Sequence, residues 1–179
     1  MAEIQIRPAV SPDLPMLSSF QHTVQTNIVW QMEIAGDEDI TQVQFRQVRL
    51  PRAVRIAYPR SPEQLRERWK NLSTILVKCV DAVPVAYISL LAREETSNVW
   101  IYDLAVHELW RHKGFATSLI TSALEWGLAR NLRRITIEMS SKNYPAICMA
   151  KKLGFEFCGY NDYYYANNDI AIFFARLMR

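Results

Sequence analysis

The sequence is short of cysteine, of clustered glycine and of long apolar runs, and each shortage excludes a class of protein. Its three cysteines, Cys79, Cys148 and Cys158, are odd in number and have no metal-ligand spacing, so we predict neither a disulfide framework nor a metal site. Cys79 and Cys148 lie in apolar patterns, which predicts buried free thiols and a reducing, cytoplasmic setting. No apolar run approaches the length of a membrane span, and the opening MAEIQIRP does not resemble a signal peptide, so no membrane partner is expected.

The charge balance is also slight. A net charge of +3 does not by itself indicate a nucleic-acid partner, while 50% hydrophobic and 22% charged residues are typical of a globular protein. The length of 179 residues suits one domain over 1–179. Alternation in TQVQFRQVRLPRAVRIAYPR, residues 41–60, predicts a two-strand ribbon or two extended arms. The segment carries five arginines: Arg46, Arg49, Arg52, Arg55 and Arg60. Strand alternation would place several of them on one solvated face, and we favour this interpretation over a nucleic-acid-binding surface.

Periodicity and capping residues predict a mixed α/β chain without linkers or repeats. The expected elements are a strand over 3–9, a helix from Pro12, a helix over 61–71, three meander strands within 73–107, a helix over 115–130, a strand over 135–139, a helix over 145–154 and two closing strands, 155–160 and 171–178. Residues 22–39 give a poor signal and are expected to be irregular or partly helical.

The segment WRHKGFATSL, residues 110–119, joins the strand WIYDLAV to an amphipathic helix that begins at Phe115. The first N–H groups of a helix have no partner within it, and the positive end of the helix dipole lies behind them. Gly114 would let an anion approach the backbone, and the neighbouring basic side chains add positive charge. This arrangement predicts a phosphate or pyrophosphate site, although a plain tight turn would also explain one glycine. The P-loop and dinucleotide-binding patterns are absent.

The stretch LAVHELWRHKGFATSLI resembles the acetyl-CoA loop of GNAT-type N-acetyltransferases, in which Arg/Gln-x-x-Gly-x-Gly/Ala follows a strand that ends in leucine, a small residue and valine. Here the loop pattern reads Arg111 to Ala116. NYPAICMAKKLGF resembles the second motif of that family, and the order of expected elements is similar over most of the chain. A weaker resemblance to streptothricin acetyltransferases lies in IYDLAV, KKLGFEFCGYNDYYY and NNDIAIFFARLM. The resemblance implies a mixed, mostly antiparallel sheet with a splayed parallel pair, flanked by helices.

The same resemblance implies acetyl-CoA as the acetyl donor. The strand end at 104–106 would bond the pantetheine arm through its backbone, the N–H groups of 111–116 would hold the pyrophosphate, and the second motif would line the cofactor from Asn143. Alternatively, Asn143 caps the helix that Pro145 opens, and the two roles are compatible. The expected cofactor-binding residues are Leu104, Ala105, Val106, Arg111, His112, Lys113, Gly114, Phe115, Ala116, Thr117, Asn143 and Ala146.

The implied reaction is direct attack of an amine on the thioester, and the amine must first lose a proton. Asp103, or a water that it holds, is the expected base, with a buried structural aspartate as the alternative. Tyr102 is its neighbour and should face the opposite side if the strand is regular. Relatives commonly carry a glutamate at the Tyr102 position, and the tyrosine that usually protonates the leaving thiolate is replaced here by Ala150. The tyrosines that could substitute for it are Tyr144, Tyr163, Tyr164 and Tyr165.

The expected function is therefore acetyl-CoA-dependent N-acetylation of a primary amine, on a small cationic molecule. Two alternatives remain: a protein lysine or N-terminal acetyltransferase, and a non-catalytic domain that senses acetyl-CoA. A cationic acceptor would require carboxylates near the site, and the candidates are Asp103, Glu94, Glu95, Asp162 and Asp169. The resemblance also leaves a homodimer open, because GNAT-like proteins are often dimers.

Overall fold

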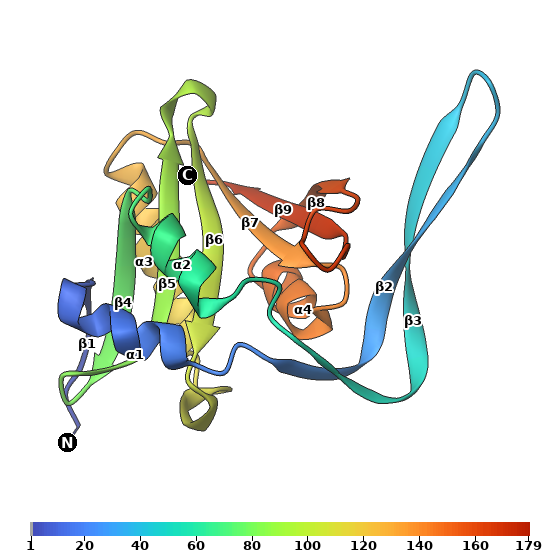
Figure 1. Cartoon of the computed structure of the whole chain (residues 1–179). Coiled ribbons are helices and arrows are strands. Elements are labelled where there is room, and N and C mark those ends of the chain that lie inside the picture. The colour runs from blue at the N-terminus through green and yellow to red at the C-terminus, as the bar shows by residue number, and fades with distance from the viewer. Residues whose placement is uncertain (1) are drawn as a thin grey trace.

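The computed structural model describes residues 2–179, which form a seven-stranded sheet, four α-helices and a separate two-stranded arm (Figure 1). The strands are β1 (Ile4–Pro8), β2 (Val24–Gly36), β3 (Thr41–Ile56), β4 (Thr74–Val80), β5 (Val83–Arg93), β6 (Asn98–Val106), β7 (Arg134–Ser140), β8 (Glu156–Asn161) and β9 (Ala171–Leu177). The α-helices are α1 (Leu14–Ser19), α2 (Pro62–Trp69), α3 (Phe115–Leu128) and α4 (Tyr144–Lys152). Short 3-10 turns are η1 (Ser11–Asp13), η2 (Glu94–Thr96) and η3 (Glu108–Trp110).

The main sheet has the strand order β1-β4-β5-β6-β7-β9-β8. Only β6 and β7 are parallel neighbours, and the other neighbouring pairs are antiparallel. Helices α1 and α2 pack Leu17 and Trp69 against one face, while α3 packs Leu119 and Ile120 against the other. This arrangement confirms the expected fold class of a mostly antiparallel sheet with one parallel pair between helices.

The parallel pair separates halfway along its length. β6 pairs with β7 only from Asn98 to Ile101, although both strands continue beyond the last pair. At the same level the register of β6 against β5 shifts, which places a bulge at Tyr102. The opposite orientation of Tyr102 and Asp103 was expected only for a regular strand, and the bulge removes that condition. The bulge turns both toward the α2 side, where Tyr102 lies under Arg68 and Asp103 bonds Arg60.

The arm formed by β2 and β3 corrects two sequence expectations. Residues 24–36 are not irregular or helical but form a long strand, and 41–56 form one continuous strand paired with it rather than a ribbon of their own. Residues 24–36 nevertheless contain a strand pattern. Large apolar residues occupy every second position in part of this segment, namely Ile28, Trp30, Met32 and Ile34.

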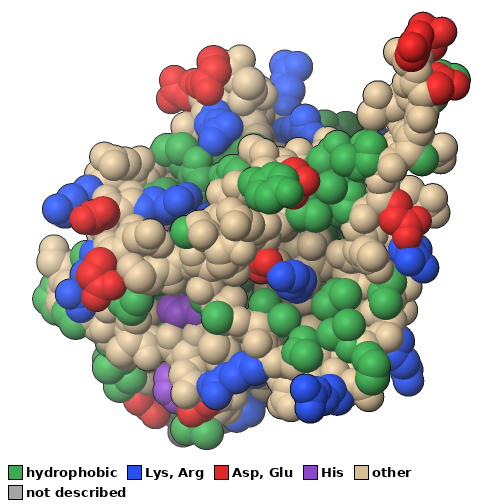
Figure 2. All heavy atoms as spheres, turned by 45° about the vertical axis from the view of Figure 1, so that its right-hand side comes forward, with side chains coloured by type: hydrophobic (Ala, Val, Ile, Leu, Met, Phe, Trp, Pro, Cys, Tyr) green, Lys and Arg blue, Asp and Glu red, His purple; other side chains and the backbone are tan. Residues whose placement is uncertain are grey.

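The arm is attached to the rest of the protein at its base. The Trp30 amide donates to the Ser141 carbonyl at 2.9 Å, and the Trp30 ring packs 5.8 Å from Phe174 between ring centroids. The outer half projects away from the main sheet, and Figure 2 shows acidic side chains at its tip, where residues 37–39 are exposed.

The cysteine expectation is half right. Cys79 is buried in the sheet, whereas Cys148 is exposed, because the inward positions of α4 are Ile147 and Ala150. Within residues 2–179, no helix is long and apolar enough to cross a membrane, and no group of three or more His, Cys, Asp or Glu side chains could hold a metal ion.

Candidate active site

A cleft of about 520 Å³ lies where β6 and β7 part. The end of β6, the loop before α3 and the first turn of α4 form its walls. Of the twelve expected cofactor residues, the structure brings eleven to this cleft and leaves out only Lys113. Those on its walls are Leu104, Ala105, Val106, Arg111, His112, Gly114, Phe115, Ala116, Thr117, Asn143 and Ala146.

The N-terminus of α3 fits an anion. Gly114 precedes the helix with a φ of 76°, in the left-handed region that favours glycine. A Cβ added to Gly114 would meet no atom within 4 Å, so the space in front of the helix is open. The unpaired N–H groups of the first turn and the helix dipole make this space favourable for a phosphate group.

Two basic side chains of the loop are engaged by groups of the protein itself. The Arg111 guanidinium donates to the backbone carbonyls of Val106 and Thr23, each at 3.2 Å, and to that of Gln21. The Lys113 ammonium lies 4.5 Å from the centroid of the Trp110 ring. Arg111 therefore fixes the loop to the segment before β2, and the loop offers backbone N–H groups rather than these two charges.

The geometry of the second motif shows the helix cap and is compatible with the expected contact with the cofactor. The Asn143 side chain accepts a hydrogen bond from the Ala146 amide at 3.2 Å, which caps α4, and both residues line the cleft. Ala150 is fully buried in the core and offers no proton. Tyr144 does not reach the cleft, because its hydroxyl donates to Gln47 of the arm at 2.9 Å. A catalytic role for Tyr144 is therefore not supported.

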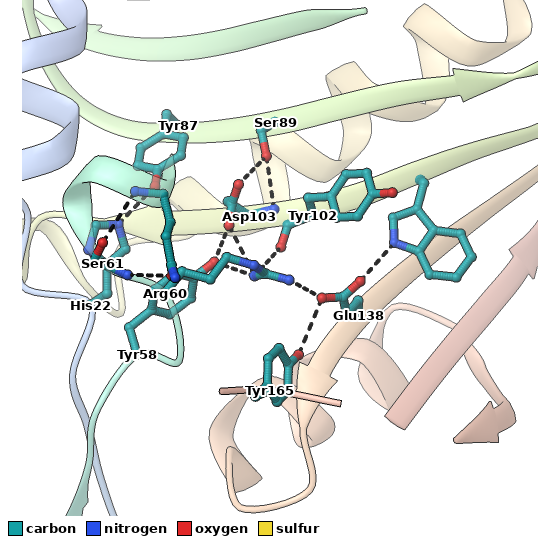
Figure 3. A network of polar contacts seen from close by, with 12 residues as sticks. His22, Tyr58, Arg60, Ser61, Tyr87, Ser89, Tyr102, Asp103, Glu138 and Tyr165 are labelled. Carbon is teal, nitrogen blue, oxygen red and sulfur yellow. Dashed lines mark hydrogen bonds and ion pairs between the residues drawn. The ribbon is translucent and has the colours of Figure 1, made fainter. Parts of the chain in front are cut away.

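A second, smaller cavity of about 70 Å³ adjoins the cleft on the side of the loop between β3 and α2. Its polar walls include Tyr58 and Arg60 from that loop, Glu138 from β7 and Tyr165 (Figure 3). The two cavities share part of their walls, and the polar side chains common to both are those of His22, Tyr58 and Asn143.

Arg60 bridges the two buried carboxylates of this region. Its Nη1 atom lies 3.3 Å from Oδ1 of Asp103, and its Nη2 atom pairs with Oε1 of Glu138. The Arg60 side chain is 6% exposed and both carboxylates are fully buried, so each charge depends on the others for compensation. Burial alone would lower the pKa of Arg60, but the surrounding acidic groups outweigh it and raise that pKa. The three groups carry a net charge of about −1.

Glu138 is the most heavily hydrogen-bonded of these carboxylates. Besides Arg60, it accepts from Trp100 Nε1 at 3.1 Å, from the Tyr164 hydroxyl at 3.0 Å and from the Tyr165 hydroxyl at 3.4 Å. Burial and the Glu138 charge raise the pKa of Tyr164 to about 12, so both tyrosines remain neutral donors at physiological pH. These four donors fix Glu138 in place as part of the cavity wall.

Asp103 lies behind Tyr58 rather than on a cavity wall. It is 1% exposed, and its Oδ2 atom accepts the Ser89 hydroxyl at 2.8 Å. Its Oδ1 atom accepts the Tyr58 hydroxyl, and Arg60 donates to that hydroxyl oxygen at 3.0 Å. Burial, followed by the Asp103 charge, raises the pKa of Tyr58 well above its usual value, so this hydroxyl stays protonated.

His22 completes the junction between the cavities. Its Nε2 atom lies 2.8 Å from the Tyr87 hydroxyl, and its ring centroid is 4.8 Å from that of Tyr58. Burial is the main cause that lowers the pKa of His22, and the nearby Asp103 charge only partly opposes it. The imidazole is therefore neutral at physiological pH.

Sequence reasoning missed four residues of this site: His22, Tyr58, Arg60 and Glu138. Glu138 gave a usable signal, since it is the single charge within the buried strand segment ITIEM. His22 and Tyr58 gave none, because they stand in the segments that precede and follow the arm.

Most of the expected acceptor carboxylates lie elsewhere. Glu94 and Glu95 belong to the η2 turn, and Asp162 follows β8 in a turn. Asp169 is buried but pairs with Lys142. Among these candidates only Asp103 belongs to the network beside the small cavity.

Comparison with known proteins gives the family of the chain and the solved structures that share its fold. The family described as acetyltransferase (GNAT) matches residues 40–155. No significant match to a curated protein sequence was found. Among solved structures, nourseothricin acetyltransferase is similar, with a TM-score of 0.84, 17% identity, and coverage of 98% of this chain and 99% of that chain.

Two further solved structures show how widely the fold is shared. A candidate streptothricin acetyltransferase from Bacillus anthracis str. Ames, in complex with acetyl coenzyme A, has a TM-score of 0.76 and 17% identity, covering 99% of this chain and 98% of that chain. The ribosomal-protein-S18-alanine N-acetyltransferase from Escherichia coli has a TM-score of 0.69 and 14% identity, covering 98% and 94%. The acceptors named for these proteins are thus both small molecules and a protein.

The family match covers most of the chain, and the splayed strand pair, the open glycine at the start of α3 and the adjoining cleft fit the cofactor of that family. The chain belongs to the GNAT acetyltransferase family and is an acetyl-CoA-dependent N-acetyltransferase.

Proposed function

We propose that this enzyme acetylates the primary amine of a small cationic molecule. The observation that carries the proposal is the small cavity of about 70 Å³ that adjoins the cofactor cleft and shares part of its walls. Such a volume admits an unbranched amine terminus and little else. The net charge of about −1 on the Arg60, Asp103 and Glu138 group favours an ammonium ion over a neutral or anionic acceptor.

In this proposal the large cleft holds the acetyl donor and the small cavity holds the acceptor. Backbone N–H groups at the start of α3 bind the pyrophosphate, and the free edge of β6 from Leu104 to Val106 bonds the pantetheine arm. Bound acetyl-CoA supplies an acetyl thioester to the junction where the two cavities meet. The amine and the thioester are then held together at this junction, and their proximity supplies much of the rate acceleration.

The first measurement is calorimetric titration with acetyl-CoA, followed by thiol release against streptothricin, spermidine, a lysine-containing peptide and a free peptide N-terminus. We expect binding, and release that is fastest with the small cations. Release with the peptides alone would move the acceptor class to proteins. Binding without release from any amine would instead favour a sensor, consistent with the missing tyrosine at Ala150.

A further inference from the structure

The junction of the two cavities is the place where an amine nitrogen and a thioester sulfur would lie together. Three polar side chains line both cavities, namely those of His22, Tyr58 and Asn143. They differ in their ability to transfer a proton. The Asn143 amide does not titrate, and its oxygen caps α4. The His22 Nε2 atom is paired with Tyr87. Tyr58 alone among the three is bonded directly to a buried carboxylate.

We propose that Tyr58 is the catalytic acid–base residue of this enzyme, and that Asp103 is its positioning partner, which holds the transferred proton. Tyr58 comes from the loop between β3 and α2, far in sequence from Ala150. It would supply the leaving thiolate with the proton that the alanine side chain at position 150 cannot supply. The proposal rests on the proposed function, because it requires an amine at the junction.

The hydrogen bonds around Tyr58 set the direction of transfer. Its hydroxyl donates to Asp103, while its oxygen accepts from Arg60 at 3.0 Å. A phenol oxygen has a second lone pair, which here is available to an amine N–H from the cavity side. The other titratable groups that face Tyr58 are His22, 4.8 Å away between ring centroids, and Tyr87, whose hydroxyl bonds His22.

The proposed step starts from the neutral amine, the ammonium ion having given its extra proton to water. As the nitrogen forms its bond to the acetyl carbon, its N–H proton passes to the Tyr58 oxygen and the phenol proton passes to Oδ1 of Asp103. The carbon–sulfur bond breaks, and its electron pair leaves with the sulfur. Asp103 returns its proton to Tyr58, which gives its own proton to the thiolate. One proton moves from nitrogen to sulfur, and Tyr58 and Asp103 end as they began.

Arg60 has a supporting part in this arrangement. It neutralises one of the two buried carboxylates and donates to the Tyr58 oxygen, which keeps the hydroxyl hydrogen directed at Asp103. Ser89 holds the other Asp103 oxygen at 2.8 Å. The carboxylate is therefore fixed on both sides, and Tyr58 is its one contact with the cavity junction.

The test compares wild type, Tyr58→Phe, Asp103→Asn and the double variant, using the panel amine that wild type acetylates fastest. Phenylalanine keeps the ring and removes only the hydroxyl, so we expect kcat to fall about 100-fold or more, with acetyl-CoA affinity little changed. The double variant should be no slower than the slower single variant, because the two residues act as one unit. Tyr160→Phe, which removes a hydroxyl from a half-buried tyrosine on β8 outside both cavities, should retain wild-type turnover.

If Tyr58→Phe did not fold, incorporation of 3-fluorotyrosine at position 58 would keep the ring and its hydrogen bonds while lowering the phenol pKa. The alkaline limb of the kcat profile should then move to lower pH, which a purely structural tyrosine would not cause. Wild-type turnover by Tyr58→Phe, an unmoved profile, or a loss confined to acetyl-CoA affinity would overturn the proposal. If wild type bound acetyl-CoA but released no thiol with any amine, the proposed function would fail and this inference with it.

Discussion

At the scale of single residues, the most consequential feature is the group of charges buried beside the small cavity. Arg60 lies between Asp103 and Glu138, and all three are shielded from water. Buried charges are tolerated only when they are paired and hydrogen-bonded, and this group meets both conditions. Arg60 and Glu138 thus form a fixed polar part of the cavity wall, and Asp103 supports it from behind.

Arg60→Ala should destabilise the protein far more than removal of an exposed arginine. It would leave two buried carboxylates without their shared cation, at a cost of about 3–5 kcal/mol in the free energy of unfolding. Arg46 is a matched control, because it pairs with Glu33 at 2.7 Å while both side chains are about half exposed. Arg46→Ala should cost about 1 kcal/mol or less. Equal shifts of the urea midpoint in the two variants would contradict the role of Arg60.

At the scale of elements, the site is assembled where regular structure is interrupted. The β6–β7 pairing stops after Ile101, the bulge at Tyr102 re-aims Asp103, and a left-handed Gly114 opens α3. Each interruption leaves backbone groups or side chains free that a continuous sheet or helix would have used. The cleft and the polar network beside the small cavity are therefore products of these three breaks together.

Gly114→Glu should abolish acetyl-CoA binding, because the new side chain and its negative charge would occupy the phosphate position in front of α3. The control is Gly114→Asn, which adds no charge and tolerates the left-handed backbone better than other residues. We expect the asparagine variant to retain measurable affinity in calorimetric titration. Unchanged affinity in the glutamate variant would show that this loop is only a turn.

The arm shows the limits of reading elements one at a time. Its two strands have alternating apolar residues, but the pattern of the first is less clear because Asn27, a residue depleted in strands, stands near its start. The expected ribbon within 41–60 had the right conformation and the wrong partner. Pairing of 41–56 with 24–36 is a contact between segments, and composition within either segment does not specify it.

At the scale of the whole molecule, stability depends on pH through groups that burial holds neutral. Burial lowers the pKa of His22 below its usual value near 6.5, so the unfolded chain takes up a proton at higher pH than the folded protein. The stability associated with neutral His22 is therefore complete above about pH 6.5 and is lost as the pH falls toward the folded pKa.

His22→Gln should reduce this dependence, because glutamine does not titrate and can still bond Tyr87. The measurement is the urea midpoint at about pH 7.5 and about pH 5.5 for both proteins. We expect wild type to lose more stability between the two pH values than the variant. An identical loss in both proteins would show that His22 is not the group responsible.

The sequence by itself determined the mixed α/β order, the loop before α3, the second motif and thereby the family, because these features depend on local periodicity, capping and spacing. Eleven of the twelve residues that the sequence predicted to bind the cofactor lie on one cleft, and their role in binding stays a prediction. Only the tertiary structure decided which side chains meet in and beside the small cavity. His22, Tyr58, Asp103 and Glu138 come from four separate segments, and the bulge in β6 sets which way Asp103 points. Such convergence depends on strand register and on the packing of the loop between β3 and α2, which no short stretch of sequence contains.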